Sequence, residues 1–345
     1  MNAPDDTLVL APMSTPATDA SAVLGLPWLV ADIGGTNARF GWVSNPAQGV
    51  QHVRKLAVAA HPSLGQAAQA YLSSLADVGL HQARPGKAAL AVATAVQGDE
   101  VAFTNSHWAF SRQALTAELG LKALLVLNDF EALALSLPRL GAQQLQAWGD
   151  LPQPQGTLAV IGPGTGLGVA GVLQTAHGWV ALPGEGGHAT LAPSNDAESA
   201  LLAAARRHLP HVSAERLLSG IGLPLLHRAA LEATGQPGVD LAAEAIVERG
   251  LAGDPACRAT LDHFCALLGS FAGSVALTLG ARGGVYIGGG IVPRLGDLFF
   301  QSAFRQRFEA KGRFQPYLQA IPTALITDTL AALAGSALAL EQHGL

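Results

Sequence analysis

The chain has 345 residues, of which 49% are hydrophobic and 13% charged, and its formal net charge is -5. This composition predicts a folded protein with a large core, and the length favours two domains. It excludes a disordered chain, and the absence of any Lys/Arg run argues against nucleic acids and anionic membranes as partners.

Residues 1–26 carry Asp5 and Asp6 where a signal peptide carries Lys or Arg, and they contain no long apolar segment. We therefore expect a flexible N-terminal extension over residues 1–26. The two cysteines, Cys257 and Cys265, lie eight residues apart without a neighbouring His/Cys cluster, which predicts neither a disulfide nor a zinc site. A reducing cytoplasmic location fits this pattern best.

From Trp28 onward, three apolar segments end in glycine or polar turns: WLVADIGG, ARFGWV and VRKLAV. They predict three successive antiparallel strands. A helix is expected from Leu64 to Val78, followed by a buried strand in ALAVATAV. The segment LKALLVLNDFEALALSLP then predicts a strand, a turn and a helix that ends at Pro138. This alternation is typical of an α/β fold.

The second half begins after a linker rich in Gln, Pro and Gly, residues 148–156. TLAVIGPGTGLGVAGVL predicts a strand, a glycine loop and a strand, so both halves open in the same way, which hints at an internal duplication. Residues 197–279 are expected to be largely helical. The uncharged run from Phe264 to Ala281 approaches membrane-spanning length, but glycine and serine residues interrupt it, so we expect a buried helix. GGVYIGGGIVPRL predicts a strand, a glycine turn and a helix.

Three glycine-rich turns, at residues 34–37, 162–166 and 288–290, each follow a short apolar strand. Glycine lets backbone amides approach a ligand closely, and converging amides bind anions. A single such turn is often only a tight hairpin, but three in one chain favour nucleotide phosphates. None is a Walker or Rossmann loop, since GxxxxGK[ST] is absent and Gly34 opens a hairpin. Asp32, at the end of its strand, would face Mg²⁺ through water.

The chain resembles the bacterial glucokinases of the hexokinase and actin-like ATPase superfamily, outside the repressor/open-reading-frame/kinase (ROK) group. Seven segments carry the resemblance in family order: DIGGTNARF, TNSHWAF, LNDFEALA, GPGTGLG, LPGEGGHATLAP, VSAERLLSG and GGVYIGGGIVPR. The resemblance implies a two-lobed α/β protein with the actin-like ATPase (ribonuclease H-like) fold, mixed sheets flanked by helices, and a cleft between the lobes. It implies a small α/β domain (27–138 plus 329–345), a large α+β domain (139–328), and hinges near Pro138 and in TDTLAALAG.

The reaction implied by the resemblance is ATP-dependent phosphorylation of D-glucose at its 6-hydroxyl, the entry step of glycolysis. Asp129 would be the general base, although an Asp at a strand end is also often a helix N-cap. Mg²⁺ would arrive with ATP near Asp32 without direct side-chain ligation, and no zinc is expected. The implied sugar-binding residues are Asn105, Asn128, Asp129, Glu185, His188 and Glu215, with Gly184, Gly186 and Gly187 keeping bulk away from the sugar. The implied nucleotide-binding residues are Asp32, Gly34, Gly35, Thr36, Asn37, Gly164, Thr165 and Gly166 at the phosphates, and Gly288, Gly289 and Gly290 at the adenosine.

Other functions share parts of this pattern. A related kinase could act on N-acetylated or epimeric hexoses, but in the ROK group a Cys-rich zinc motif usually follows the sugar-site His, and none follows His188. A sugar-sensing transcriptional regulator would need a helix-turn-helix and a basic face ahead of Trp28. A polypeptide-binding ATPase of the actin-like kind would need a further domain, and the chain ends at Leu345. A purely structural role would leave Asp129 and the second phosphate loop unexplained. The resemblance also suggests a homodimer formed through the larger lobe.

Overall fold

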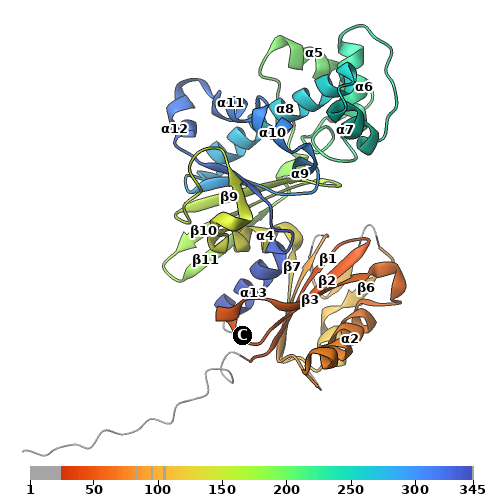
Figure 1. Cartoon of the computed structure of the whole chain (residues 1–345), viewed down its shortest axis with the longest axis vertical. Helices are drawn as coiled ribbons and strands as arrows, with labels where there is room; N and C mark the ends of the chain where they lie inside the picture. Colours follow the sequence, from red (N-terminus) through yellow and green to blue (C-terminus); the bar gives the residue numbers. More distant parts are fainter. Residues whose placement is uncertain (1–24, 82–83, 95, 104–105, 344–345) are drawn as a thin grey trace, which may run out of the picture.

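Two mixed β-sheets organise the chain, one in each of two lobes (Figure 1). The computed structural model describes residues 25–81, 84–94, 96–103 and 106–343. Most of the expected N-terminal extension lies outside these residues. Gly25 is buried, and Leu26 packs on the core of the first lobe.

The first sheet is apolar on both faces of its central strands, because helices cover it on either side. All six residues of β4 are buried, as are five of the six in β1. β1, β2 and β3 pair in antiparallel fashion, which confirms the predicted meander, while β1, β4 and β7 run parallel. β4 ends at Val92, level with the end of β1, so the strand predicted in ALAVATAV is shorter than expected. In spatial order the strands are β3 (Gln51–Ala57), β2 (Asn37–Val43), β1 (Trp28–Ile33), β4 (Lys87–Val92) and β7 (Ala123–Asn128).

The second sheet repeats this arrangement. An antiparallel meander of β9, β10 and β11 continues into the parallel strands β12 and β13, and β8 adds an antiparallel edge. The predicted strand, glycine loop and strand at residues 157–175 are confirmed as β9 and β10. In spatial order the strands are β11 (Gly178–Gly184), β10 (Leu167–Thr175), β9 (Thr157–Pro163), β12 (Gly284–Ile287), β13 (Thr323–Ile326) and β8 (Leu145–Ala147); a small hairpin of β5 (Glu100–Ala102) and β6 (Ala109–Ser111) stands apart.

Helices of the large lobe gather on the side of the second sheet that faces away from the small lobe (Figure 1). The longest is α8. It begins at Pro255, where the side chain of Asp254 accepts a hydrogen bond from the Cys257 amide, and it ends at Gly280, which has φ +63. In the described part of the chain, α8 alone is long and apolar enough to cross a membrane, and 72% of its most apolar stretch is buried within the protein. The prediction of a buried helix is therefore confirmed. The large-lobe helices are α5 (Asp196–Ala205), α6 (Leu223–Ala233), α7 (Ala243–Leu251), α8 (Pro255–Leu279), α9 (Val292–Leu295), α10 (Asp297–Gln301), α11 (Phe304–Glu309) and α12 (Gln315–Gln319).

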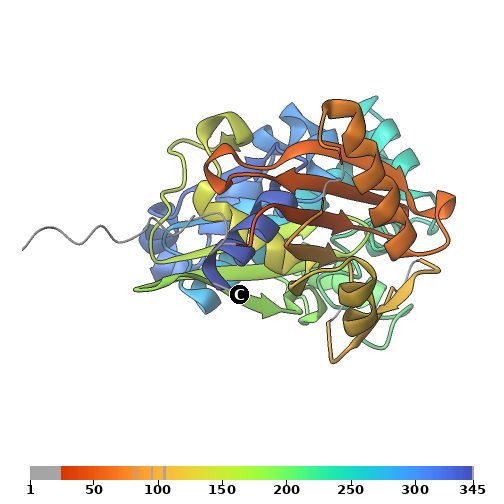
Figure 2. The ribbon, with the colours of Figure 1, turned by 90° about the horizontal axis from the view of Figure 1, so that it is seen from below.

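Two helices lie at the junction of the lobes, where α4 (Asp129–Ser136) packs against α13 (Ala331–His343). The two approach closely because Gly335 lacks a side chain, and a Cβ there would overlap the Ala132 carbonyl. Leu333 and Leu340 of α13 also pack on Trp28 of the first sheet, and Figure 2 shows α13 in dark blue beside the red strands. The last helix of the chain thus packs on the first lobe. The small-lobe helices are α2 (Leu64–Ser74) and α3 (Arg112–Glu118).

Candidate active site

Two partly buried acids meet at one edge of the first sheet. β1, β4 and β7 are parallel and end level with one another, since Ile33 pairs with Val92 and Val92 with Asn128. Asp32 is the penultimate residue of β1, and Asp129 directly follows β7. Ligands of α/β sheets commonly bind outside the carboxyl ends of such strands. The topology thus brings together two acids that are 97 positions apart in the sequence.

The side chain of Asp129 is not the N-cap of α4. That role belongs to Asn128, whose Oδ1 accepts a hydrogen bond of 2.9 Å from the Phe130 amide, while its Nδ2 donates to the Thr94 carbonyl at 3.3 Å. Asp129 is the first residue of the helix, and its Oδ1 also accepts from the Phe130 amide at 2.9 Å. The amide of Asp129 itself is a second hydrogen-bond donor to this carboxyl, so two backbone amides favour its ionised form.

The environment of Asp129 shifts the pKa of its carboxyl. Burial, followed by repulsion from Asp32 and then from Glu185, raises the pKa of its carboxyl to about 6, although the hydrogen bond from the Phe130 amide opposes the rise. A base is most effective when its pKa lies near the working pH. The influence of Glu185 also shows that a residue of the large lobe faces this edge of the small-lobe sheet.

Arg39 is a residue of this site that the sequence analysis missed. It sits directly opposite Asp32 in the β1–β2 pairing, and its Nη1 donates to Oδ2 of Asp32 at 3.0 Å. Burial raises the pKa of Asp32, and the Arg39 guanidinium opposes the rise. The signal was present in DIGGTNARF, because a tight hairpin after Ile33 places residues 32 and 39 opposite each other.

The first glycine loop closes this hairpin and leaves open space beside it. The Gly34 amide donates to the Asn37 carbonyl at 3.0 Å. A Cβ on Gly34 would have only that carbonyl oxygen nearby, at 3.6 Å, so the space beside it is open. Gly35 is partly exposed and Thr36 is exposed. A ligand can therefore approach the backbone of this turn.

The second and third glycine loops meet at a cavity of about 630 Å³ in the large lobe. Gly164, Thr165 and Gly290 line it, and a Cβ on Gly164 or Gly290 would meet no atom within 4 Å. Gly288 is buried, and Gly289 packs against Pro163 with φ +77. Only one of the three glycines expected at the adenosine thus lines the cavity, while the other two shape the turn.

Two charged residues of this cavity escaped the sequence analysis. Glu244 lies in the first turn of α7 and Arg294 in α9, and both line the cavity. They are 50 residues apart, and no local pattern marks either one. Only the packing of α7 and α9 around the second glycine loop brings them together.

Two acids and a histidine form a cluster, with Glu185 and His188 in the loop after β11 and Glu215 in the segment before α6. His188 Nε2 lies 3.9 Å from Glu185 Oε2, and its Nδ1 lies 3.9 Å from Glu215 Oε1. Glu215 Oε2 also accepts a hydrogen bond of 2.9 Å from the Leu167 amide, at the end of the second glycine loop. The structure thus joins three of the predicted sugar-binding residues, whereas Asn105 lies outside the described residues.

The glycines of this loop serve packing more than ligand access. A Cβ on Gly186 would lie 2.9 Å from Val169, and one on Gly187 would overlap the Leu167 carbonyl, both in β10. These two residues make room for the neighbouring strand, and their expected role beside a sugar stays a prediction. Gly184 has no atom closer than 4.0 Å to its Cβ position, so its surroundings are open.

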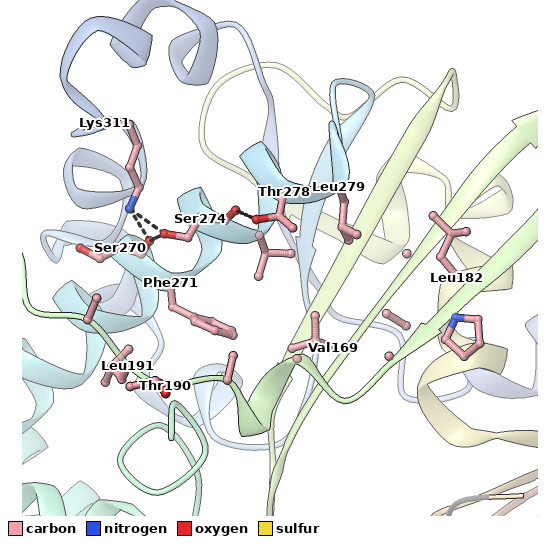
Figure 3. A pocket seen from close by; sticks show the side chains of 18 of the residues that line it. Val169, Leu182, Thr190, Leu191, Ser270, Phe271, Ser274, Thr278, Leu279 and Lys311 are labelled. Atoms are coloured by element: carbon pink, nitrogen blue, oxygen red, sulfur yellow. Dashed lines mark hydrogen bonds between the residues drawn. The ribbon is translucent and has the colours of Figure 1, made fainter. Parts of the chain in front are cut away.

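The same loop forms one wall of a second cavity, of about 360 Å³, between β10 and α8 (Figure 3). Most of the residues that line it are apolar, with Leu182 and Phe271 among them, and Ser270, Ser274 and Thr278 of α8 add hydroxyl groups. Lys311 stands at its rim, but its Nζ already donates to the Ser270 carbonyl and the Ser274 hydroxyl. A hexose needs several fixed acceptors and donors, so this cavity suits it poorly.

The described residues include no group of three His, Cys, Asp or Glu side chains that could hold a metal.

Comparison with known proteins gives consistent results. A sequence profile described as Glucokinase matches residues 29–343. The glucokinase of Chromobacterium violaceum is 50% identical over 319 residues, covering 92% of this chain and 90% of that protein. The glucokinase of Aromatoleum aromaticum is 50% identical over 317 residues, covering 91% and 95%. The crystal structure of a glucokinase from an Antarctic psychrotroph has a TM-score of 0.84 at 37% identity, covering 91% of this chain and 98% of that one. The predicted two-lobed actin-like fold is therefore confirmed.

Proposed function

The chain belongs to the glucokinase family, whose reaction is the phosphorylation of glucose, and from this premise we propose how it acts. It transfers the terminal phosphoryl group of MgATP directly to the 6-hydroxyl of D-glucose and releases ADP and glucose 6-phosphate. Asp129 is the general base. The reaction would be the entry step of glycolysis.

The observation that carries this proposal is the environment of Asp129. Its carboxyl is buried at the sheet edge, with a pKa raised to about 6 by burial, Asp32 and Glu185. At neutral pH it is mostly ionised, so it can accept the proton of an alcohol as the oxygen attacks phosphorus. The Asp129 carboxylate is the acceptor, and the hydrogen bond from the Phe130 amide to its Oδ1 fixes its orientation.

Asp32 suits the magnesium ion that accompanies ATP. Arg39 binds its Oδ2, and its Oδ1 accepts no hydrogen bond from the described residues, so one oxygen is free to bind water of a hydrated ion. The ion would neutralise charge on the phosphates. Arg39 keeps the Asp32 carboxylate oriented, and the open turn at Gly34 admits phosphate oxygens to its amides.

The sugar would lie between Asp129 and the loop of the large lobe. Glu185, His188 and Glu215 together offer carboxylate acceptors and an imidazole for the sugar hydroxyls. Glu215 also accepts a hydrogen bond from the Leu167 amide, so a sugar bound to Glu215 would be linked through this side chain to the second phosphate loop. Asn128 and Asn105 remain predicted partners of the sugar hydroxyls.

The nucleotide would extend from the first loop into the cavity of the large lobe. Gly164, Thr165 and Gly166 would approach the phosphates, and Gly290 would lie beside the adenosine. Arg294 and Glu244 are the charged side chains at that cavity. A lobe closure that follows sugar binding would exclude water from the phosphoryl group.

The test is a coupled assay of hexose phosphorylation with MgATP, MgADP or polyphosphate as donor. The panel is glucose, mannose, fructose, N-acetylglucosamine and N-acetylmannosamine. Glucose with MgATP should lead by a wide margin. If an N-acetylated sugar is phosphorylated fastest, the proposed substrate is wrong, but the assignment of Asp129 as the base still holds. Binding of glucose without any turnover would contradict the kinase and support a sensor.

Three further expectations belong to this proposal. The protein works as a homodimer through the large lobe, which light scattering after size exclusion would test. It is cytoplasmic, which fractionation of its source cells would test. Its domains divide at residues 27–138 with 329–345 and at 139–328, and limited proteolysis with and without glucose would locate the hinges.

A further inference from the structure

The aromatic ring next to the base rests on two glycines of the other lobe. Phe130 is the second residue of α4, and α4 lies against β9, β10 and β11 (Figure 1). A Cβ on Gly168 would overlap three atoms of the ring, Cγ, Cδ2 and Cε2, and one on Gly162 would overlap Cζ and lie 2.6 Å from Cε1. Gly162 and Gly168 face each other across the β9–β10 pairing. The Phe130 ring therefore packs on both glycines, with one edge over Gly168 and the other over Gly162.

Backbone conformation does not require glycine at either place. Neither Gly162 nor Gly168 has a positive φ, in contrast to Gly289 in the third loop. Both lie within strands, where glycine weakens the sheet and often marks the close approach of another group. The ring of Phe130 is that group, so the space it occupies accounts for both missing side chains.

The glycine pair stands at the base of the second phosphate loop. Residues 163–167 join the two glycines, and this turn carries Gly164, Thr165 and Gly166. On the other side of the ring, the residue before Phe130 is Asp129, whose Oδ1 accepts from the Phe130 amide. One side chain thus connects the proposed base on the small lobe with the loop that would hold the donor phosphates on the large lobe.

We propose that Phe130 is a positioning residue that sets the distance between the Asp129 carboxylate and the second phosphate loop through its seat on Gly162 and Gly168. The inference rests on the proposed function, because it concerns the alignment of that reaction. In-line transfer is sensitive to such alignment, and a displacement of about 1 Å can cost about a hundredfold in rate. Phe130 touches neither reactant and acts through Asp129 and the loop.

The experiment compares two size changes made separately and together. Phe130→Leu removes the ring, Gly168→Ala intrudes on it, and the double variant places the new methyl in the vacated space. Each single change should lower kcat by about tenfold to a hundredfold while the KM values for glucose and MgATP move by less than about threefold. The double variant should recover at least about tenfold in kcat over Gly168→Ala.

Gly171→Ala is the matched control in the same strand. A Cβ there would lie 3.2 Å from its nearest neighbours, and Gly171 has no positive φ, so kcat should stay within about twofold of wild type. All assays run well below the thermal midpoint of each variant. If Phe130→Leu fails to fold, Phe130→Met, which keeps the volume without the ring, takes its place.

The outcomes separate this inference from the proposed function. A folded Phe130→Leu with wild-type kcat would overturn the positioning role. Equal losses of kcat in Gly168→Ala and in the double variant would show that the contact with Phe130 is not the reason for the glycine. Changes in KM that account for the whole loss of kcat/KM would also overturn the proposal. If the wild-type protein phosphorylates no hexose, the proposed function fails and the inference falls with it.

Discussion

Replacing Asp129 with Asn should make the protein more stable at neutral pH while it removes activity. The native pKa of Asp129 is raised from 3.8 to about 6. Each unit corresponds to about 1.4 kcal/mol, so ionising this carboxyl costs the folded state about 3 kcal/mol. Asn carries no charge and should escape this cost, although its amide oxygen can still accept from the Phe130 amide.

The sign of the effect follows from proton binding. Between pH 4 and pH 6 the folded protein holds the Asp129 proton more tightly than the unfolded chain does, so this residue lowers stability as pH rises through that window. Asp129→Asn should therefore exceed wild type by about 3 kcal/mol at pH 7. The difference should shrink to less than about 1 kcal/mol at pH 4, where Asp129 is protonated in the folded protein and about half protonated in the unfolded chain.

Thermal unfolding at pH 7 and pH 4 measures this difference. For a chain of this length, about 3 kcal/mol corresponds to a rise of about 4 °C in Tm at pH 7. Asp150→Asn is the control, because Asp150 is exposed in the linker before β9. A gain that persists at pH 4, or no gain at pH 7, would refute the burial of a charged base at this position.

The same variant tests catalysis. Loss of a general base typically costs about a hundredfold to ten-thousandfold in rate, and kcat of Asp129→Asn should fall in that range while glucose and ATP still bind. A kcat near that of wild type would remove Asp129 from the proton transfer. Lost activity combined with gained stability would be hard to explain by misfolding.

Three further predictions follow from the same site. In wild type, kcat/KM should fall below about pH 6 as Asp129 takes up a proton. In Asp32→Asn this fall in the pH profile should occur at lower pH, because one repelling charge is gone. An unchanged pH profile would contradict the repulsion between Asp32 and Asp129. Glu185→Gln should raise Kd for glucose more than Kd for MgATP, measured by titration calorimetry, and equal weakening of both would remove Glu185 from the sugar site. Arg39→Gln leaves the partly buried Asp32 carboxylate without its cation, so the free energy of unfolding should drop by about 1–3 kcal/mol, and a denaturant midpoint equal to that of wild type would show that the ion pair contributes little.

The loops and strand ends could be predicted from the sequence because their determinants are local. Apolar segments that end in glycine predicted the first meander and the first two strands of the second, and Pro138 predicted the end of α4 to within two residues. Asp32 and Asp129 were found because each lies at the carboxyl end of an apolar strand, Asp32 as its penultimate residue and Asp129 directly after it. The choice of Asn128 as the N-cap, which leaves Asp129 free, was not decided by the pattern, since both residue types cap helices well.

Residues that act through distant partners could not be predicted in this way. Glu244 and Arg294 enter one cavity only because α7 and α9 pack around the second glycine loop. Gly186 and Gly187 look like ligand-binding glycines in GEGGH, yet their neighbours are atoms of β10. No property of a short segment reveals which strand will lie against it.

The similarity of the two halves also separates what is local in the sequence from what depends on tertiary packing. The sequence by itself determined that each half opens with a strand, a glycine turn and a strand, because alternation, turn chemistry and backbone freedom act over a few residues. Only the tertiary structure decided that both sheets share one order of five strands, and that Phe130 of one lobe rests on Gly162 and Gly168 of the other. Such contacts depend on how segments far apart in the chain pack together, and that packing is settled by the whole core.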